Sequence, residues 1–147
     1  MIDGKTIACA GGTFNRLHAG HRALLGTAAA VADMVRVGVT SDAFVKRVRG
    51  PRARLVRPYA QRAGDVRALL ESIAPGRFEV VPLEDALTPV ERPEFDAIVI
   101  SPDTERIALT INELRASRRL ATLKIVVVPM VKAFDGRPMS STRIVSG

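Results

Sequence analysis

The sequence predicts a doubly wound α/β fold, a parallel sheet with helices on both faces, in a single domain over residues 1–147. Three observations predict it. The 147 residues are about the length of one domain, short β-branched apolar runs recur along the chain, and helical patterns lie between them. A chain that alternates strands and helices in this way forms parallel strands joined by right-handed crossovers.

Five apolar runs are the predicted strands: 5–10, 34–39, 77–82, 95–100 and 123–128. Each run is almost continuously apolar, which is typical of strands covered on both faces. Three segments carry apolar residues three and four apart, and these predict helices over 20–32, 59–73 and 104–120. Ligands in such folds bind outside the carboxyl ends of the strands. We therefore expect the site in the segments after residues 10, 39, 100 and 128.

Composition excludes several classes of protein. The chain is 47% hydrophobic and 25% charged, which argues against disorder, and its one cysteine cannot form an internal disulfide. No apolar stretch approaches the roughly 18 residues of a membrane span, and the first residues, MIDGKTIACAGG, lack the apolar run of a signal peptide. We expect a soluble, cytoplasmic protein with no membrane partner.

The charge balance is basic, with 22 Lys and Arg against 15 Asp and Glu and a net charge of +7. Such a balance favours anionic partners: nucleic acid, an acidic membrane surface or phosphorylated small molecules. Most of the cations are arginines, and an Arg-rich coding bias would give the same count. The charge balance favours these anionic classes of partner but does not select one of them.

The segment after the first predicted strand reads GGTFNRLHAGH (11–21). Gly11 and Gly12 permit a tight turn and a close approach by phosphate, and Thr13 adds a hydroxyl. His18 and His21, the only two histidines, stand where the next helix starts, and a helix start attracts anions. We predict a phosphate site here; the alternative is a plain turn with surface histidines. No third ligand accompanies the pair, so no protein metal site is expected.

Four further segments follow predicted strands or lie in the helices beyond them: VTSDAFVK (39–46), RPYAQR (57–62), ISPDTERIALTINELR (100–115) and DGRPMSSTRI (135–144). The GGTF…HxGH loop alone also marks cytidylyltransferases and NMN adenylyltransferases. Together, the five segments resemble the archaeal-type phosphopantetheine adenylyltransferases, which are Rossmann-like members of the HxGH nucleotidyltransferase superfamily.

The resemblance implies adenylyl transfer from ATP to 4′-phosphopantetheine, giving dephospho-CoA and pyrophosphate in coenzyme A biosynthesis, with Mg²⁺ held by substrate and water. It implies that Thr13 orients the acceptor phosphate and that His18 and Lys46 stabilise the transition state. The implied nucleotide-binding residues are Gly11, Gly12, Phe14, Gly20, His21, Asn112, Arg115, Ser140, Ser141, Thr142 and Arg143. The alternatives are another acceptor for the same chemistry (NMN, FMN or glycerol phosphate) and, less favoured, a basic nucleic-acid-binding domain.

Residues 140–143 also predict a phosphate-binding helix start independently of the resemblance. Ser140, Ser141 and Thr142 are good N-cap and first-turn residues, so they predict a short helix whose amides and hydroxyls could hold a triphosphate. Arg143 adds a fork-shaped donor for phosphate oxygens. A plain helix cap is the alternative.

Six cations and no acid occupy residues 46–57: Lys46, Arg47, Arg49, Arg52, Arg54 and Arg57. Gly50 and Pro51 predict a loop. We favour a mobile lid over anionic substrates, and a solvated basic loop is the alternative. Nucleic-acid binding is disfavoured because no aromatic residue lies within the run for bases to stack on.

Cys9 and Asn15 carry two further predictions. Cys9 lies in an apolar strand and is expected to be a small buried hydrophobe, not a nucleophile. Asn15 stands where many relatives of the motif carry Asp, and this departure is expected to alter the hydrogen bonds of the loop.

Overall fold

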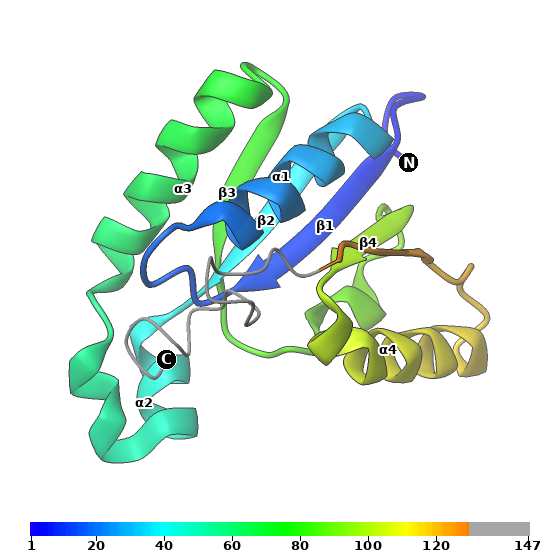
Figure 1. Cartoon of the computed structure of the whole chain (residues 1–147). Coiled ribbons are helices and arrows are strands. Elements are labelled where there is room, and N and C mark those ends of the chain that lie inside the picture. The colour runs from blue at the N-terminus through cyan, green and yellow to red at the C-terminus, as the bar shows by residue number, and fades with distance from the viewer. Residues whose placement is uncertain (130–147) are drawn as a thin grey trace.

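The structure, a computed structural model, describes residues 1–129 (Figure 1). Five strands form one sheet in the order β3-β2-β1-β4-β5, and every pairing is parallel. This arrangement confirms the predicted doubly wound α/β class. The strands are β1 (Ile7–Gly12), β2 (Met34–Thr40), β3 (Phe78–Leu83), β4 (Ala97–Ile100) and β5 (Lys124–Val127).

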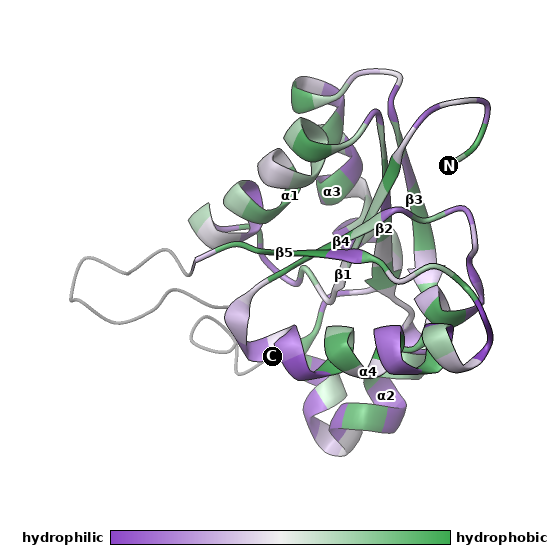
Figure 2. Ribbon diagram, turned by 90° about the vertical axis from the view of Figure 1, so that its right-hand side faces the viewer, coloured by the Kyte–Doolittle hydropathy of each residue, from purple (hydrophilic) through white to green (hydrophobic). Residues whose placement is uncertain are grey.

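Helices cover both faces of the sheet. Figure 2 shows α1 (Ala19–Val31) and α3 (Tyr59–Ile73) on one side and α4 (Glu105–Ser117) on the other. The helix α3 has the predicted bounds, whereas α1 and α4 begin or end within a few residues of theirs. Three short 3₁₀ helices join the longer elements: η1 (Gly50–Leu55), η2 (Thr88–Glu91) and η3 (Pro102–Thr104).

The basic segment predicted as a loop is helical over most of its length. It comprises the second half of α2 (Asp42–Arg49) and all of η1. The Ser41 hydroxyl accepts a hydrogen bond from the Phe44 N–H (3.0 Å) and caps α2. Gly50 has a φ of 55°, which ends α2, and Pro51 lies in the first turn of η1. The loop prediction was therefore wrong, because these residues separate two helices.

A separate hydrophobic core lies on each face of the sheet. Leu25, Val37 and Leu70 belong to the core under α1 and α3, whereas Ile98 and Ile111 belong to the core under α4. The central strands β1 and β4 are almost wholly buried, but β3 and β5 are only half-buried because they are the edges. The expectation of burial on both faces therefore fails for the two edge strands.

The order of the strands reverses between β1 and β4. From β1 the chain moves outward to β2 and β3, and it then returns to the other side of β1 to form β4 and β5. The loops after β1 and β4 consequently flank the same point at the carboxyl edge, where ligands of such folds bind. Among residues 1–129, no helix is both long and apolar enough to cross a membrane.

Candidate active site

The turn after β1 depends on small residues and one unusual backbone conformation. A Cβ at Gly12 would lie 3.2 Å from the Phe14 ring, and one at Gly11 would lie 3.3 Å from a Leu83 methyl group. Phe14 itself has a φ of 51°, a left-handed conformation that costs a non-glycine residue about 1 kcal/mol or more. This turn puts the Phe14 ring into the core while the chain passes on to α1.

Thr13 lies at the end of a hydrogen-bond relay. The buried Arg62 donates through Nη1 to the Thr40 hydroxyl (3.2 Å), which donates to the Thr13 hydroxyl (3.1 Å). Arg62 also donates to the Thr13 carbonyl (2.9 Å) and is held by Asp42 (3.1 Å). Because the Thr13 oxygen accepts in this relay, its own proton remains available for a ligand oxygen.

Asn15 ties the glycine-rich loop to the end of the basic segment. Its fully buried side chain accepts from the Arg57 N–H (2.8 Å) and donates to the Leu55 carbonyl (3.3 Å). The Arg57 guanidinium donates in turn to the Asn15 carbonyl. An aspartate at this position would have no donor for the Leu55 carbonyl. The asparagine side chain thus suits this loop, because it can both donate and accept the two hydrogen bonds found here.

His18 and His21 form a capping box at the start of α1. The His18 Nδ1 accepts from the Gly20 N–H (3.0 Å), and the His21 Nδ1 accepts from the His18 N–H (3.4 Å). The two rings are stacked with their centroids 3.9 Å apart. Both imidazoles therefore use one nitrogen as an acceptor, which leaves Nε2 of each neutral ring as an N–H donor.

Burial keeps both imidazoles neutral near pH 7. It lowers the pKa of His18 from 6.5, and burial together with the neighbouring His18 lowers the pKa of His21 from 6.5 to about 4. The His18 Nε2 is itself buried and has no hydrogen-bond partner among the described residues. A buried donor without a partner is rare and costly. At a helix start, it is well placed for an anionic ligand.

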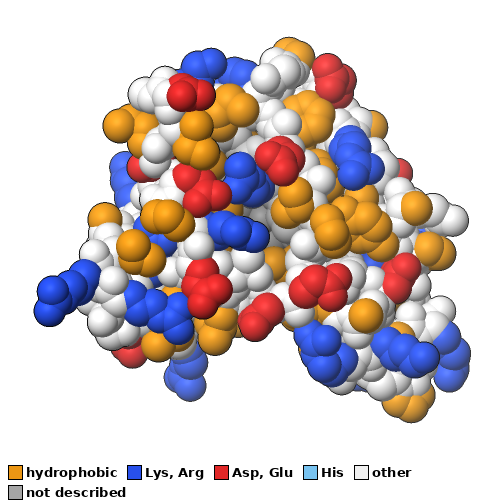
Figure 3. All heavy atoms as spheres, turned by 180° about the vertical axis from the view of Figure 1, so that it is seen from behind, with side chains coloured by type: hydrophobic (Ala, Val, Ile, Leu, Met, Phe, Trp, Pro, Cys, Tyr) orange, Lys and Arg blue, Asp and Glu red, His pale blue; other side chains and the backbone are white. Residues whose placement is uncertain are grey.

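The helix α2 presents cations to this loop. Arg49 Nη2 lies 3.4 Å from the Thr13 hydroxyl, and the exposed Lys46 precedes it by three residues, on the same face of the helix. Arg47 instead donates to the Glu84 carbonyl at the end of β3 (2.7 Å). In Figure 3, Lys and Arg side chains gather at the lower right corner, which α2 and η1 form. The corner provides positive charge beside Thr13.

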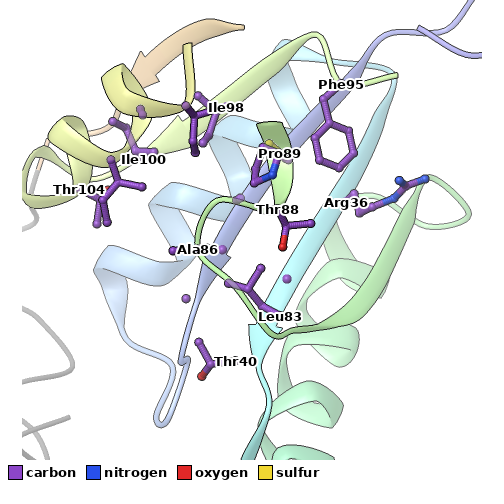
Figure 4. Close-up of a pocket in the computed structure, with 18 of the residues that line it drawn as sticks. Arg36, Thr40, Leu83, Ala86, Thr88, Pro89, Phe95, Ile98, Ile100 and Thr104 are labelled. Carbon is purple, nitrogen blue, oxygen red and sulfur yellow. The ribbon is translucent and has the colours of Figure 1, made fainter. Parts of the chain in front are cut away.

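A cavity of about 530 Å³ opens beside the same edge, on the α4 side of the sheet. Figure 4 shows Thr40 at one end of it and Arg36 and Phe95 at the other, with Leu83, Ala86 and Pro89 between them. Its lining is mostly apolar. The hydroxyls of Ser101 and Thr104, which follow β4, join Thr40 in the lining. An apolar chamber thus meets the hydroxyls at the carboxyl edge of the sheet.

Two loop residues expected to contact the nucleotide have other tasks. The Phe14 side chain is 1% exposed and its ring centroid lies 5.1 Å from that of His21, so it supports that imidazole. The Gly20 N–H is already bonded to His18. Both residues thus position the loop, and their contact with a nucleotide stays a prediction.

Asn112 and Arg115 anchor α4 to the neighbouring backbone. The Asn112 amide group exchanges two hydrogen bonds with the backbone of Leu123, at 2.7 and 2.9 Å. Arg115 is 1% exposed, and its guanidinium donates to the carbonyls of Pro89, Arg92, Phe95 and Ala121. Both side chains are occupied by the fold, which argues against the predicted contact of their helix face with the nucleotide.

Cys9 is buried as expected, and burial raises the pKa of its thiol to about 12, which keeps it protonated and unreactive. Between residues 1 and 129, no group of three His, Cys, Asp or Glu side chains could hold a metal ion. The expected triphosphate contacts, Ser140, Ser141, Thr142 and Arg143, lie outside the described residues.

The structure adds residues that the sequence did not single out. Thr40, Ser101 and Thr104 follow or end strands at the same edge, so the rule on the carboxyl ends of strands could have found them. Arg62 carried no signal of this kind, and Arg49 was predicted only as one of six cations in the basic segment. They belong to the site only because α2 and α3 fold back against the loop after β1.

Comparison with known proteins fits this geometry. Residues 9–147 match the family model described as cytidylyltransferase-like. A protein of Methanopyrus kandleri named phosphopantetheine adenylyltransferase is 49% identical over 136 residues, which are 91% of this chain and 85% of that protein. The chain belongs to the phosphopantetheine adenylyltransferase family. A second such adenylyltransferase, from Methanothermobacter thermautotrophicus, is 38% identical over 97% of this chain and 84% of its own length.

Solved structures share the fold of this phosphopantetheine adenylyltransferase family member. A protein with unknown function from Archaeoglobus fulgidus superposes with a TM-score of 0.69 and 31% identity, over 83% of this chain and 97% of that one. The pantoate-beta-alanine ligase of Francisella tularensis superposes with a TM-score of 0.65 over 98% of this chain and 66% of its own. Its identity is 17%, so it supports the Rossmann-like fold alone.

Proposed function

We propose that the chain transfers the adenylyl group of ATP to 4′-phosphopantetheine, giving dephospho-CoA and pyrophosphate, a step of coenzyme A biosynthesis. The observation that carries the proposal is the junction of two features: polar donors around Thr13 and His18, and an apolar cavity that begins at Thr40. The adenylyltransferase names of the relatives support it. With ATP as a substrate, we place the reaction in the cytoplasm.

The acceptor fits the shape and chemistry of the cavity. Its phosphate would lie at the carboxyl edge, where Thr13 has a free hydroxyl proton and Arg49 adds positive charge. Its branched, mostly apolar arm would extend between Leu83 and Ile98 along the sheet. Mononucleotide acceptors such as NMN or FMN have no comparable long arm, so the cavity favours phosphopantetheine among the alternatives.

The reaction needs no general base. A phosphate monoester is largely ionised near pH 7, so an acceptor phosphate oxygen attacks the α-phosphorus of ATP directly. The new O–P bond forms as the bond from the α-phosphorus to the bridging oxygen breaks, and the electron pair leaves with pyrophosphate. Positioning and charge stabilisation then supply the catalysis.

Each donor has a proposed task in this step. Thr13 orients the acceptor phosphate, and Arg62 fixes Thr13 through Thr40. The His18 Nε2–H and the Lys46 ammonium donate to oxygens of the α-phosphoryl group, where negative charge accumulates in the transition state. His21 and residues 140–143 would hold the phosphates of the leaving group. Gly11 and Gly12 let the nucleotide approach the backbone.

We also propose that Mg²⁺ enters with ATP. The nearest carboxylate of the relay, Asp42, already accepts from Arg62 and from the Tyr59 N–H (2.8 Å). The described residues therefore fit a metal that is bound by phosphate oxygens and water. When bound, Mg²⁺ would neutralise triphosphate charge.

A substrate screen tests the proposal. Purified protein would be incubated with ATP or CTP and with phosphopantetheine, NMN, FMN or glycerol 3-phosphate, and pyrophosphate release would be measured. We expect release with ATP and phosphopantetheine only. Release with CTP, or with another acceptor and not with phosphopantetheine, would overturn the assignment.

A further inference from the structure

An arginine closes the end of the cavity that lies away from the reacting phosphates. Arg36 precedes Thr40 by four residues on β2, which separates them by about 13 Å along the strand. The two side chains and Gly38 between them face the same side of the sheet. A Cβ at Gly38 would lie 3.1 Å from the Leu83 side chain, so the glycine lets Leu83 pack closely over β2 in the lining of the cavity.

Three neighbours hold the Arg36 guanidinium in place. Nη1 donates to Glu94 (2.9 Å), Nη2 lies 3.5 Å from Glu79, and the guanidinium carbon is 5.2 Å from the centroid of the Phe95 ring. Figure 4 shows Arg36 and Phe95 together at this end. The orientation of the guanidinium group is therefore fixed before any ligand arrives.

The remaining nitrogen, Nε, has no partner in the described part of the chain. Nε of Arg36 is buried and lacks a hydrogen-bond acceptor among residues 1–129. Buried donors are almost always paired, and a charged donor left unpaired costs more than a neutral one. An elongated ligand bound in the cavity can supply the missing acceptor with one of its own oxygen atoms.

We propose that the Arg36 Nε–H donates to the second amide carbonyl of the phosphopantetheine arm, which makes Arg36 a specificity-determining residue for the length of the acceptor. The inference rests on the proposed function. The first amide carbonyl lies too close to the phosphate to reach this end of the cavity. The second, one β-alanine unit further along, is the acceptor that an extended arm brings to Arg36.

Arg36→Lys separates this hydrogen bond from the charge, because lysine keeps a cation beside Glu94 but lacks the Nε–H. Its steady-state kinetics would be measured with phosphopantetheine and with a shortened acceptor, the N-ethylamide of phosphopantoic acid, which lacks the second carbonyl. We expect the KM for phosphopantetheine to rise about tenfold or more. The kcat, the KM for ATP and the KM for the shortened acceptor should change less than about twofold.

Arg92→Lys is the matched control, because Arg92 also lines the cavity but is exposed. We expect no effect that depends on the length of the acceptor. Equal KM increases for both acceptors in Arg36→Lys, or no increase for either, would overturn the proposal. Wild-type protein that turns over neither acceptor would refute the proposed function instead.

A measurement on the wild-type protein covers the case in which Arg36→Lys does not fold. Its affinity for phosphopantetheine would be compared with its affinity for an analogue in which two methylene groups replace the second amide. We expect binding of the analogue to be weaker by about tenfold or more. Equal affinities would contradict a hydrogen bond to that carbonyl.

Discussion

His18 has two tasks that belong to its two ring nitrogens. Nδ1 accepts from the Gly20 N–H and caps α1, whereas Nε2 is buried with no partner in the described part of the chain. The cap fixes the tautomer, since a nitrogen that accepts a hydrogen bond cannot carry the proton of a neutral ring. The fold of the loop thus determines that the ring offers an N–H donor to the phosphates.

His18→Asn separates the two tasks. Asparagine is a good N-cap but has no group at the Nε2 position, so we expect kcat to fall about 10²–10³-fold with an unchanged melting temperature. His18→Ala should lose the same activity and, in addition, about 1 kcal/mol of stability. Steady-state kinetics and thermal unfolding of both variants check this. A kcat within a few-fold of wild type would remove His18 from the mechanism.

His21 gives the protein a pH-dependent stability. Its pKa falls from 6.5 to about 4 on folding, so between these values the unfolded chain binds more protons, and stability falls as the pH falls through this window. His21→Gln, which can keep the capping box, removes this dependence. The wild-type free energy of unfolding, measured in urea, should therefore decline relative to that of His21→Gln from pH 7 to pH 4.5. A constant difference would contradict the neutral, buried imidazole.

Sequence could identify the residues of the site that are close together in the chain. Thr13, His18 and His21 lie within one loop and helix start, so their spacing alone predicted a shared anion site. Arg62 meets Thr40 and Thr13 across 22 and 49 residues, a contact that only the packing of α3 creates. The structural contacts of Arg115 could not be predicted, because helical spacing gives its neighbours on the helix but not the carbonyls that surround it.

At the scale of elements, α2 and η1 bring part of the basic segment to the site. Arg49 lies beside Thr13, whereas Arg52 and Arg54 are exposed on η1. We expect Arg49→Gln to lower turnover at least about tenfold through lost charge stabilisation. The double variant Arg52→Gln/Arg54→Gln should keep wild-type turnover. Kinetics of both proteins check this.

The same variants test whether the basic segment binds nucleic acid. Binding should be weak and non-specific, in the range of about 10⁻⁴–10⁻⁶ M at physiological salt. A titration against single-stranded RNA at several salt concentrations would measure it. Tight binding that Arg52→Gln/Arg54→Gln abolishes, together with unchanged turnover in Arg49→Gln, would favour a nucleic-acid arm over a lid.

The helix α4 depends on Arg115 for its attachment. Four backbone carbonyls accept from this buried guanidinium, and lysine cannot reach all of them. We expect Arg115→Lys to lower the free energy of unfolding by about 3 kcal/mol and to leave the KM for ATP unchanged. Arg118→Lys, at an exposed ion pair with Glu91 (3.0 Å), should cost less than about 0.5 kcal/mol. A raised KM for ATP in Arg115→Lys would support the nucleotide role that the resemblance implies.

Strong periodicity explains which elements were predictable. The apolar runs of β1 and β4 and the apolar face of α3 lie in the cores, so burial imposed the pattern that the sequence shows. The apolar residues of α2, Phe44, Val45 and Val48, do lie three and four apart, but the helix is only eight residues long and buries only Val45. The start of α2 depends on the Ser41 cap, a signal that the six cations obscured.

At the scale of the whole molecule, the strand order creates the site. Because β1 pairs with both β2 and β4, the loop after β1, the end of β2 and the start of α4 meet at one edge. Thr13, Thr40 and Ser101 are far apart in the chain and reach this edge only through that order. A sequence of alternating strands and helices predicts the class of fold, but several strand orders satisfy it.

Oxygen labelling tests the central claim most directly. Phosphopantetheine carrying ¹⁸O in its phosphate group would be incubated with ATP and the purified chain, and the products would be analysed by mass spectrometry. Direct attack by the acceptor predicts dephospho-CoA that retains all of the label, including the bridging oxygen, and pyrophosphate that contains none. Label in pyrophosphate, or failure to form dephospho-CoA, would contradict the account.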